Sequence, residues 1–502
     1  MSKLLDIKTF GELKKSGYRP RPIKQELREN LIAQLKNKEA GFEGIIGYED
    51  TVIPDLQTAI LSQHNILLLG LRGQAKTRIA RLMVNLLDEY VPYVEGSELF
   101  EDPFEPISWF ARTRLHEQGD DTPIAWMHRS ERYTEKLATP DVTVADLIGD
   151  VDPIKAATLK LAYSDERVLH FGLVPRAHRG IFVINELPDL QARIQVALFN
   201  ILQEKDIQIR GFKLRLPLDV QFVFTANPED YTNRGSIVTP LKDRIESQIL
   251  THYPRSIEIS KKITQQEASL TQQQKENVEA DGLVKDLVEQ IAFEARNSEY
   301  IDKKSGVSAR LTISAFENLI SNAERRMILN DEKSTFVRIS DFLGVIPAIT
   351  GKIELVYEGE QEGPAKVANI LVGKAVKTLF IKYFPDPEKI KRSKTENPYM
   401  PITNWFSSGN SVNILDDLSK KEYNEVLNSI PGLKAITKQF HPRISENQQL
   451  LLMEFLLHGL SEFSQLSKSF LDNGYGFKDM LGSLFNATFD DDEDTFDDDN
   501  RY

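Results

Sequence analysis

The sequence predicts an α/β fold, in which a parallel sheet is flanked by helices, followed by a second half that is largely helical. Three apolar runs that end in polar residues, at 66–69, 180–184 and 220–226, are typical of buried strands. Between them, and beyond residue 255, apolar residues recur at intervals of three and four, which is the period of amphipathic helices. These patterns favour a sheet covered by helices and then helical domains.

Chain length, net charge and cysteine count limit the kinds of domain, partner and chemistry that this protein can have. A chain of 502 residues is long enough for two or three domains. Its net charge of −13 makes nucleic acid an unfavourable partner, because sequence-independent binders of nucleic acid carry a basic surface. The absence of cysteine excludes disulfides, zinc ribbons, iron–sulfur clusters and thiol catalysis.

No segment of the sequence has the pattern of a signal peptide or a membrane span. The first residues lack an apolar core of signal-peptide length. The longest apolar stretch, 450–460, is interrupted by Glu454 and His458 and is too short to span a bilayer. We therefore expect a cytoplasmic protein with no membrane insertion.

The segment 70–77, GLRGQAKT, follows the first apolar strand and precedes a helix predicted over 78–90. Strand, glycine-containing turn, Lys-Thr and helix form the context of a phosphate-binding loop. In such a loop backbone N–H groups face an anion, Lys76 reaches the outer phosphates and the Thr77 hydroxyl holds Mg²⁺. The other loop residues expected to contact a nucleotide are Gly70, Gly73, Gln74 and Ala75. The alternative is a strand–turn–helix junction that carries Lys-Thr by chance.

Ala75 departs from the usual loop pattern, G-x-x-x-x-G-K-[ST], which has glycine at this position. Alanine fits without strain if its φ is near the helical region. If the loop requires a positive φ, alanine costs about 1 kcal/mol. The sequence leaves both conformations open.

The strand 180–184 ends in Asn185-Glu186, about a hundred residues after the loop, which is the Walker-B arrangement. There the first acid steadies Mg²⁺ and the second activates the attacking water. Asn185 replaces the usual aspartate: it still accepts a hydrogen bond from a Mg²⁺-bound water but brings no negative charge. Glu186 keeps the position of the general base. A buried strand that merely ends in Asn-Glu is the alternative.

Three further features support a nucleotide site. After a helix predicted over 190–204 and a hairpin over 207–216, the strand 220–226 ends at Asn227, where a γ-phosphate sensor would stand. Arg244 could reach a phosphate in a neighbouring protomer. Upstream, the turn with Ile46 and Gly47 can form the wall against which an adenine packs, although it equally suits a plain entry into a helix over 51–62.

From residue 44 to about 255 these segments resemble, in order, the ATPase subunit of magnesium chelatase and the related MoxR group of AAA+ proteins. The matching segments are 47–50, 70–77, 93–96, 146–152, 172–180, 185–186, 226–229 and 241–244. The resemblance implies a P-loop AAA+ core with an insertion before the Walker-B strand, and ATP and Mg²⁺ as ligands. MoxR-like members have a similar loop with alanine in it, whereas Asn185 departs from both groups.

The resemblance also implies roles for individual residues and an assembly. Asn227 takes the sensor-1 position, Arg244 the arginine-finger position, and Arg310, in Ser308-Ala309-Arg310, the sensor-2 position of an α-helical lid. An arginine that caps a helix is the competing interpretation of Arg310. The implied protein is a homo-hexameric ring that hydrolyses ATP to remodel a partner with a von Willebrand A-type domain.

Three other functions are weighed against this one. A nucleotide-binding scaffold with slow or no hydrolysis is supported only by Asn185, and Glu186, Asn227 and Arg244 oppose it. The motor subunit of a true magnesium chelatase would have the same ATPase core, but Asn185 and the long C-terminal extension disfavour it. A sigma-54-type transcription activator is disfavoured because no helix-turn-helix or basic patch is evident.

The expected domains are bounded at residues 40, 255, 383 and 484. Residues 1–40 form a polar extension, with a helix over 23–35 whose charges lie on a solvated face. The α/β core spans 41–255, and the lid spans 256–383 with helices over 283–296, 312–329 and 365–383. An all-α extension at 384–484, with helices over 414–430 and 447–470, is assigned to partner docking or ring closure. Residues 485–502 form a disordered acidic tail that aids solubility or binds a basic partner.

Overall fold

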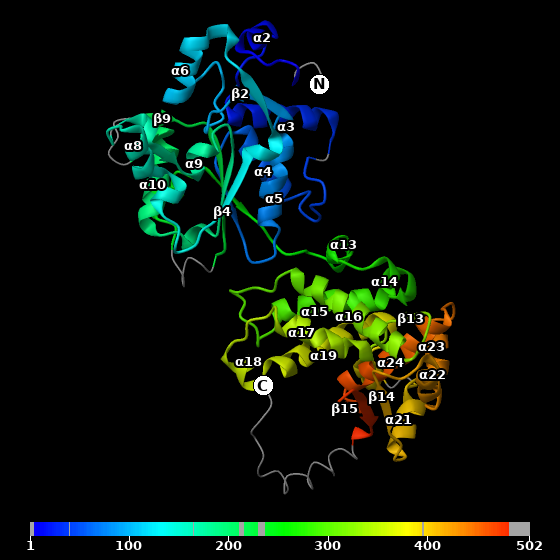
Figure 1. The fold of residues 1–502 in the computed structure, drawn as a ribbon. Helices are drawn as coiled ribbons and strands as arrows, with labels where there is room; N and C mark the ends of the chain where they lie inside the picture. The colour runs from blue at the N-terminus through cyan, green and yellow to red at the C-terminus, as the bar shows by residue number, and fades with distance from the viewer. Residues whose placement is uncertain are drawn as a thin grey trace. The chain divides into compact units, whose positions relative to one another are not determined.

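The computed structural model describes residues 5–39, 41–163, 165–209, 215–228, 236–393 and 396–480. The chain forms two compact units, Met1–Tyr253 and Pro254–Tyr502 (Figure 1). The predicted acidic tail, 485–502, lies outside the described residues. Within the described ranges, no helix has the length and apolar character needed to cross a membrane.

The first unit is built on a five-stranded parallel sheet with the strand order β11–β1–β10–β7–β4. Its strands are β1 (Ile66–Leu69), β4 (Tyr133–Leu137), β7 (Gly180–Asn185), β10 (Val220–Ala226) and β11 (Ser247–Leu250). The three strands expected from the sequence are therefore β1, β7 and β10, and they are adjacent. Because parallel strands end at the same edge, the residues that follow these three strands meet there.

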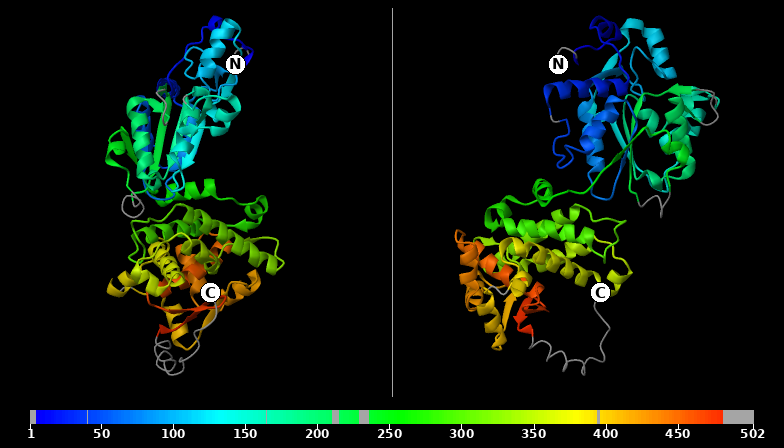
Figure 2. Two further views of the ribbon diagram at one scale, coloured as in Figure 1. Left: turned by 60° about the vertical axis from the view of Figure 1, so that its left-hand side comes forward. Right: turned by 180° about the vertical axis from the view of Figure 1, so that it is seen from behind.

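Helices cover both faces of this sheet (Figure 2), and alternate side chains of each strand point to opposite faces. Ile66 and Leu68 pack with α3 (Ile23–Asn37), α4 (Val52–Leu61) and α5 (Lys76–Leu82). Leu67 belongs to the opposite layer, which includes α10 (Ala192–Glu204). The predicted α/β core, with a parallel sheet between helices, is confirmed.

The insertion between α5 and β7 is more structured than the sequence indicated. The helix predicted over 78–90 is wrong in its second half: α5 gives way to a 3₁₀ turn, η1 (Met83–Leu86), and then to β2 (Tyr90–Val94). The buried Glu26 carboxylate accepts the N–H of Asp88 at 2.7 Å, which fixes the chain where it leaves the helical path. The remaining elements are β3 (Ile124–His128), α6 (Trp109–Gln118), η2 (Gly119–Asp121), η3 (Arg129–Arg132), α7 (Val144–Leu147), β5 (Gly149–Val151), α8 (Pro153–Leu159), η4 (Glu166–Val168), β6 (Leu169–Phe171) and α9 (Leu173–Arg176).

Further short elements follow β7 in the described part of the first unit. These are η5 (Leu187–Asp189), the antiparallel pair β8 (Asp206–Gln208) and β9 (Arg215–Pro217), and α12 (Thr239–Lys242). The pair confirms the hairpin predicted over 207–216, whose turn lies in the part of the chain that is not described.

The N-terminal segment is an integral part of the first unit and not a solvated extension. After α2 (Phe10–Lys15), α3 buries Ile23, Leu27 and Leu31 in the layer behind β1. Glu26, expected on a solvated face, is 3% exposed. The prediction placed its carboxylate in water because a buried counter-ion from a distant segment cannot be seen in a helical pattern.

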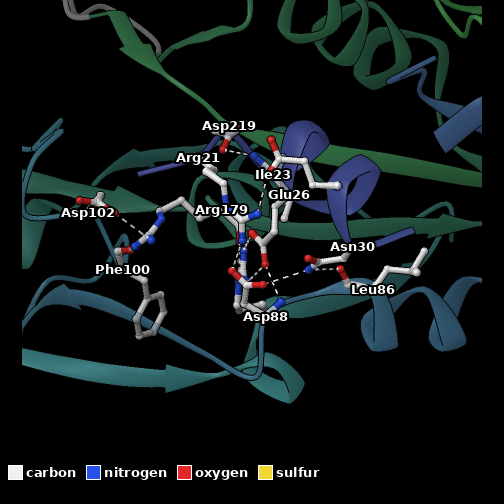
Figure 3. A network of polar contacts seen from close by, with 12 residues as sticks. Arg21, Ile23, Glu26, Asn30, Leu86, Asp88, Phe100, Asp102, Arg179 and Asp219 are labelled. Carbon is white, nitrogen blue, oxygen red and sulfur yellow. Dashed lines mark hydrogen bonds and ion pairs between the residues drawn. The ribbon is translucent and has the colours of Figure 1, made fainter. Parts of the chain in front are cut away.

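That counter-ion is Arg132, which follows β3, the strand that pairs antiparallel with β2. Its guanidinium donates to both carboxylate oxygens of Glu26, at 2.7 and 2.6 Å, and both side chains are buried. A second buried pair lies beside the first: Arg179 approaches Asp102 at 3.0 Å (Figure 3). The Tyr18 hydroxyl donates to the same carboxylate. These polar contacts attach α3 and the segment before it to the sheet.

Asp219 belongs to the same region and carries a buried carboxylate that accepts the N–H of Ile23 at 2.6 Å (Figure 3). Burial raises the pKa of Asp219 to about 6. A group whose pKa is raised on folding contributes stability that is fully present below its unfolded pKa and is lost as the pH rises through its folded pKa. The free energy of unfolding that Asp219 contributes therefore falls between about pH 4 and 6, and above pH 6 the loss stays constant.

We predict that Asp219→Asn stabilises the first unit at pH 8 and not at pH 4. The amide still offers an oxygen to Ile23 but cannot ionise. From the shift in pKa, the expected gain at pH 8 is on the order of 1–3 kcal/mol. Urea unfolding of both proteins at the two pH values measures it, with Asp120→Asn as the control, since Asp120 is exposed. An equal difference at both pH values would contradict this assignment.

The second unit contains the helices that were expected. The segments 283–296, 312–329 and 365–383 correspond to α15 (Gly282–Asn297), α16 (Arg310–Leu329) and α19 (Pro364–Tyr383). Shorter elements surround them: α13 (Ile257–Glu267), α14 (Gln272–Asn277), β12 (Val278–Glu279), β13 (Thr335–Phe336), η6 (Ser340–Val345), α17 (Ile346–Thr350) and α18 (Tyr357–Glu362). The remaining helices are α20 (Pro387–Ser393), α21 (Met400–Ser407), α22 (Lys420–Asn428), α23 (Leu433–Phe440) and α24 (Glu446–Glu462).

The C-terminal region is not all-α, because it also contains a three-stranded antiparallel sheet. Its strands are β14 (Val412–Leu415), β15 (Ser467–Leu471) and β16 (Gly474–Lys478), with β16 in the middle. The helices predicted over 414–430 and 447–470 are therefore too long at their ends. Gly474 is needed for this sheet to form. A Cβ at Gly474 would lie 2.3 Å from the Ile414 carbonyl oxygen, so only glycine allows the two strands to approach each other.

Residues before and after 383 share a single hydrophobic core, which runs from Val278 to Phe477. The fully buried Glu454 of α24 reinforces it by accepting the backbone N–H groups of Ile339 and Ser340 and the hydroxyl of Tyr423. Burial raises the pKa of Glu454. The segment expected as a separate extension is thus folded together with the segment expected as a lid.

Candidate nucleotide-binding site

The loop 70–77 connects the end of β1 to the start of α5, as its sequence indicated. Lys76 is buried, and its ammonium donates to the carbonyl oxygens of Gly70 and Leu71 and, at 2.6 Å, to the amide oxygen of Asn227. These contacts hold a cation inside a loop at a helix N-terminus, where an anionic ligand is favoured.

The loop conformation answers the question that Ala75 left open. Its φ is 58° and ψ 14°, in the left-handed region, so the alternative with a cost of about 1 kcal/mol applies. Gly70 is required for a different reason. A Cβ at Gly70 would lie 1.9 Å from the Thr251 hydroxyl and 2.2 Å from the Gln74 side-chain oxygen. Gly73 has a φ of 72°, which favours glycine.

Asn227, at the end of β10, connects Lys76 to Glu186, at the end of β7. Its amide oxygen accepts from the Lys76 ammonium, and its amide nitrogen donates to the Glu186 carboxylate at 2.8 Å. These two contacts fix the orientation of the amide. A single side chain thus joins the expected phosphate-binding cation to the expected water-activating base.

Glu186 is held in an unusual backbone conformation, with a φ of 56°. Its N–H donates to the Thr225 hydroxyl at 3.1 Å, which stabilises the turn from the neighbouring strand. A non-glycine residue with a positive φ costs of order 1 kcal/mol and tends to persist where function needs it. Here it directs the carboxylate away from the path of β7 and towards Asn227.

Asn185 and Thr77 form the candidate Mg²⁺ site. The Asn185 amide oxygen accepts from the Thr77 hydroxyl at 3.4 Å and from the Thr225 hydroxyl at 3.2 Å. Uncharged oxygens from a hydroxyl and an amide are ligands, or partners of bound water, that Mg²⁺ accepts. Their positions beside Lys76 fit a cation bound between phosphates and protein, without a carboxylate at residue 185.

The turn with Ile46 and Gly47 lies beside the loop because the next residue, Tyr48, is attached to it. The buried Tyr48 hydroxyl donates to the His252 carbonyl at 2.6 Å and lies 3.1 Å from the Gln74 carbonyl. Burial raises the pKa of Tyr48 to about 12. Ile46 and Gly47 are both partly exposed, as a wall for an adenine would need to be.

The contacts of His252 select one tautomer of its neutral ring. Nδ1 lies 2.8 Å from the Tyr253 carbonyl oxygen and must donate, so in the neutral ring Nε2 accepts from the Thr51 hydroxyl at 2.9 Å. The ring also packs edge-on against Tyr48. The end of the first unit therefore closes one side of the loop.

Arg244, the predicted finger, lies apart from these residues within the first unit. It follows α12, with its side chain 41% exposed, its guanidinium near Asp243 and over the ring of Phe199. Arg310 is the first residue of α16 in the second unit and is exposed. The residues that the first unit brings together are Lys76, Asn227, Glu186, Asn185 and Thr77.

Comparison with known proteins agrees with this geometry. Residues 158–249 match the family profile described as the Sigma-54 interaction domain, an AAA+ domain. The matched range includes the strands β7, β10 and part of β11, with Asn185, Glu186, Asn227 and Arg244. The first unit has a P-loop AAA+ fold. Such a fold implies that the site binds a nucleotide.

Solved structures of AAA+ proteins are similar at low identity. NtrX from Brucella abortus is 13% identical, with 58% of this chain and 55% of that chain covered and a TM-score of 0.33. The match thus spans little more than half of NtrX. A complex of subunits BchI and BchD of magnesium chelatase is 17% identical, with 64% of this chain and 98% of that chain covered and a TM-score of 0.33. Hsp104 with ATPγS and casein is 14% identical, with 62% of this chain and 50% of that chain covered and a TM-score of 0.35. Similarities this weak add nothing to the argument from the site.

Several residues that shape the site were not expected from the sequence. Thr225, inside the apolar strand β10, contacts both Asn185 and Glu186, and Thr251 donates to the side chain of Gln74 at 2.6 Å. A hydroxyl in an otherwise apolar buried strand is the signal that could have indicated Thr225. For Tyr48, Thr251 and His252 no such signal exists, because only the sheet brings them to the loop.

Proposed function

We propose that this protein is an ATPase that acts as a ring and uses ATP hydrolysis to remodel a partner protein. The observation that carries the proposal is the chain of contacts from Lys76 through Asn227 to Glu186. Cation, sensor and base stand at the ends of adjacent strands, in the order that hydrolysis of a terminal phosphate needs.

In this proposal the protein acts mainly by positioning and by charge. Lys76 moves from loop carbonyl oxygens to the phosphates, and Asn227 responds because it shares a hydrogen bond with that ammonium. Glu186 then orients a water and accepts its proton. A bound Mg²⁺, held through Thr77 and Asn185, would neutralise phosphate charge.

The exposed Arg244 supplies the argument for an assembly. A guanidinium that does not reach the loop of its own unit can serve the site of the next chain, where it would stabilise charge that develops on the phosphate. A homo-hexameric ring with such shared sites follows from the family resemblance. Arg310, as sensor 2, would couple the second unit to the nucleotide.

Mixing two inactive variants tests this arrangement. Glu186→Gln and Arg244→Ala chains should each lack turnover alone, because each spoils every site in its own assembly. In an equal mixture roughly a quarter of the interfaces combine an intact Glu186 with an intact Arg244, so partial phosphate release should return. If no activity returns, Arg244 does not act between chains.

Asn185 supports a second candidate, a nucleotide-binding scaffold with slow or no hydrolysis. We predict that Asn185→Asp increases the apparent affinity for Mg²⁺ by about tenfold, because a charged oxygen replaces a neutral one of the same shape. Asn185→Ala, which removes the oxygen, should act in the opposite direction. Phosphate release measured against Mg²⁺ concentration checks both. ATP binding without turnover in the wild type, with turnover only in Asn185→Asp, would favour the scaffold.

The partner can be identified by trapping. Glu186→Gln with ATP should hold a client on a stalled ring, which can then be recovered and analysed. The MoxR resemblance favours a protein with a von Willebrand A-type domain, and a porphyrin-binding subunit would indicate the motor of a magnesium chelatase. The profile match at 158–249 adds a sigma-54 factor as a candidate.

A further inference from the structure

A groove with a cavity volume of about 640 Å³ lies in the second unit. It runs between α20, the N-terminal end of α21 and α23. Its lining is mainly apolar and includes Ile390, Met400, Pro401, Ile436 and Phe440. Met400 is half exposed. An apolar groove with an exposed methionine is suited to large apolar side chains of a bound segment.

Lysines flank the lining on one wall of this groove. Lys389 and Lys391 are exposed on α20, on either side of the lining residue Ile390. Within the described parts of the chain, neither of these two lysines makes an ion pair, and Glu388 of α20 pairs with Lys377 at 3.5 Å. On α23 the exposed Lys434 and Lys438 lie on the helix face away from the lining, and Glu396 is the charged side chain in the lining itself. In a chain with a net charge of −13, the two unpaired lysines beside the lining favour an acidic occupant.

The described part of the chain ends within reach of this groove. The Ser407 hydroxyl, at the end of α21, donates to the Asp479 carboxylate at 3.0 Å. The other end of the same helix carries Met400 and Pro401, which line the groove. A helix of this length spans about 12 Å. Residues 481–502 number 502 − 480 = 22 and would reach about 70 Å when extended, so they span the distance easily.

The sequence of that segment has the composition that the groove needs. Eight carboxylates lie between residues 490 and 500, and aromatic residues are interspersed with them at Phe485, Phe489 and Phe496. Phenylalanine side chains would fill the apolar lining while the carboxylates lie among the lysines. We propose that residues 485–502 bind in the groove between α20 and α23 of the same chain. The proposal does not depend on ATP hydrolysis.

Cross-linking in the full-length protein tests the proposal. Because the sequence has no cysteine, only the introduced thiols can react. The pair Gln439→Cys and Asn486→Cys places one thiol in the groove lining and one beside Phe485. With a short bismaleimide it should form a cross-linked monomer about tenfold faster than a control pair, because docking raises the local concentration of the tail. The control is Glu360→Cys with Asn486→Cys, since α18 and α23 lie at opposite ends of the second unit (Figure 1).

Three changes should slow the groove cross-link several-fold. One is salt at roughly 1 M, which screens charges beyond about 3 Å. The second is Lys389→Glu with Lys391→Glu, whereas Lys303→Glu with Lys304→Glu, exposed lysines elsewhere in the second unit, should have no effect. The third is Phe489→Ser with Phe496→Ser, which should leave the melting temperature unchanged. Equal rates for the groove and control pairs would overturn the proposal, as would cross-links that form only between chains.

Discussion

Replacing Glu186 by glutamine should lower steady-state phosphate release by at least about a hundredfold. A positioned general base contributes typically ~10²–10⁴-fold to a rate, and glutamine cannot accept a proton. Phosphate release at saturating ATP and Mg²⁺ measures the loss.

We expect this variant to fold and to bind nucleotide. The Glu186 carboxylate accepts a hydrogen bond, at 2.8 Å, from the amide nitrogen of Asn227, and a glutamine oxygen can accept the same bond. Binding of a fluorescent ATP analogue should therefore stay near the wild-type level. As a control, Asp189→Asn, three residues along, should keep most of the turnover. Turnover within a few-fold of wild type in Glu186→Gln would show that Glu186 is not the base.

Removal of Glu26 should have the largest effect on stability in the first unit. Glu26→Ala leaves the Arg132 guanidinium buried without its carboxylate, and breaking a buried pair in this way costs about 3–5 kcal/mol. It also leaves the N–H of Asp88 without its acceptor. We expect α3 to detach and the first unit to unfold at a much lower concentration of denaturant.

The measurement can be restricted to the first unit. Of the three tryptophans, Trp109 and Trp126 belong to it and Trp405 to the second unit, so fluorescence in a Trp405→Phe background reports the first unit alone. The matched control is Lys14→Ala, which breaks an exposed pair with Asp120 and should cost no more than about 1 kcal/mol. Glu26→Met with Arg132→Met should recover much of the loss, since an apolar pair avoids the unpaired charge. Equal costs for Glu26→Ala and Lys14→Ala would refute the role of this pair.

Features carried by local patterns were predictable from the sequence. The strands β1, β7 and β10, the loop 70–77, and the polar residues Asn185, Glu186 and Asn227 at the strand ends lie where the pattern of apolar runs indicated. These signals are local because a buried strand needs a continuous apolar run and a helix needs its own period. Where competing contacts decide the local structure, the prediction failed, as at 83–90, where the backbone is held by Glu26.

The organisation of the second half was predictable only in part. Helical periods identified α15, α16 and α19, but strands such as β16, with the sequence GYGFK, have the glycine content of a turn. The sheet β14–β16–β15 depends on pairing between residues some sixty positions apart. The hydrophobic core of the second unit contains residues from both sides of the domain boundary that was predicted at residue 383. Pairing and burial over such separations leave no local pattern.

The sequence by itself determined that a glycine-containing loop with Lys76 follows the first strand of the sheet, and that Asn185, Glu186 and Asn227 stand at the ends of two further strands. From this order it predicted the loop, base and sensor of an AAA+ ATPase. The tertiary structure decided what holds them in place: Asn227 between Lys76 and Glu186, Thr225 behind Asn185, and Tyr48 and His252 beside the loop. It also decided that α3 belongs to the core, through Arg132. The physical reason is the same in each case, since a hydrogen bond or ion pair between distant segments exists only once the sheet has brought its strands together.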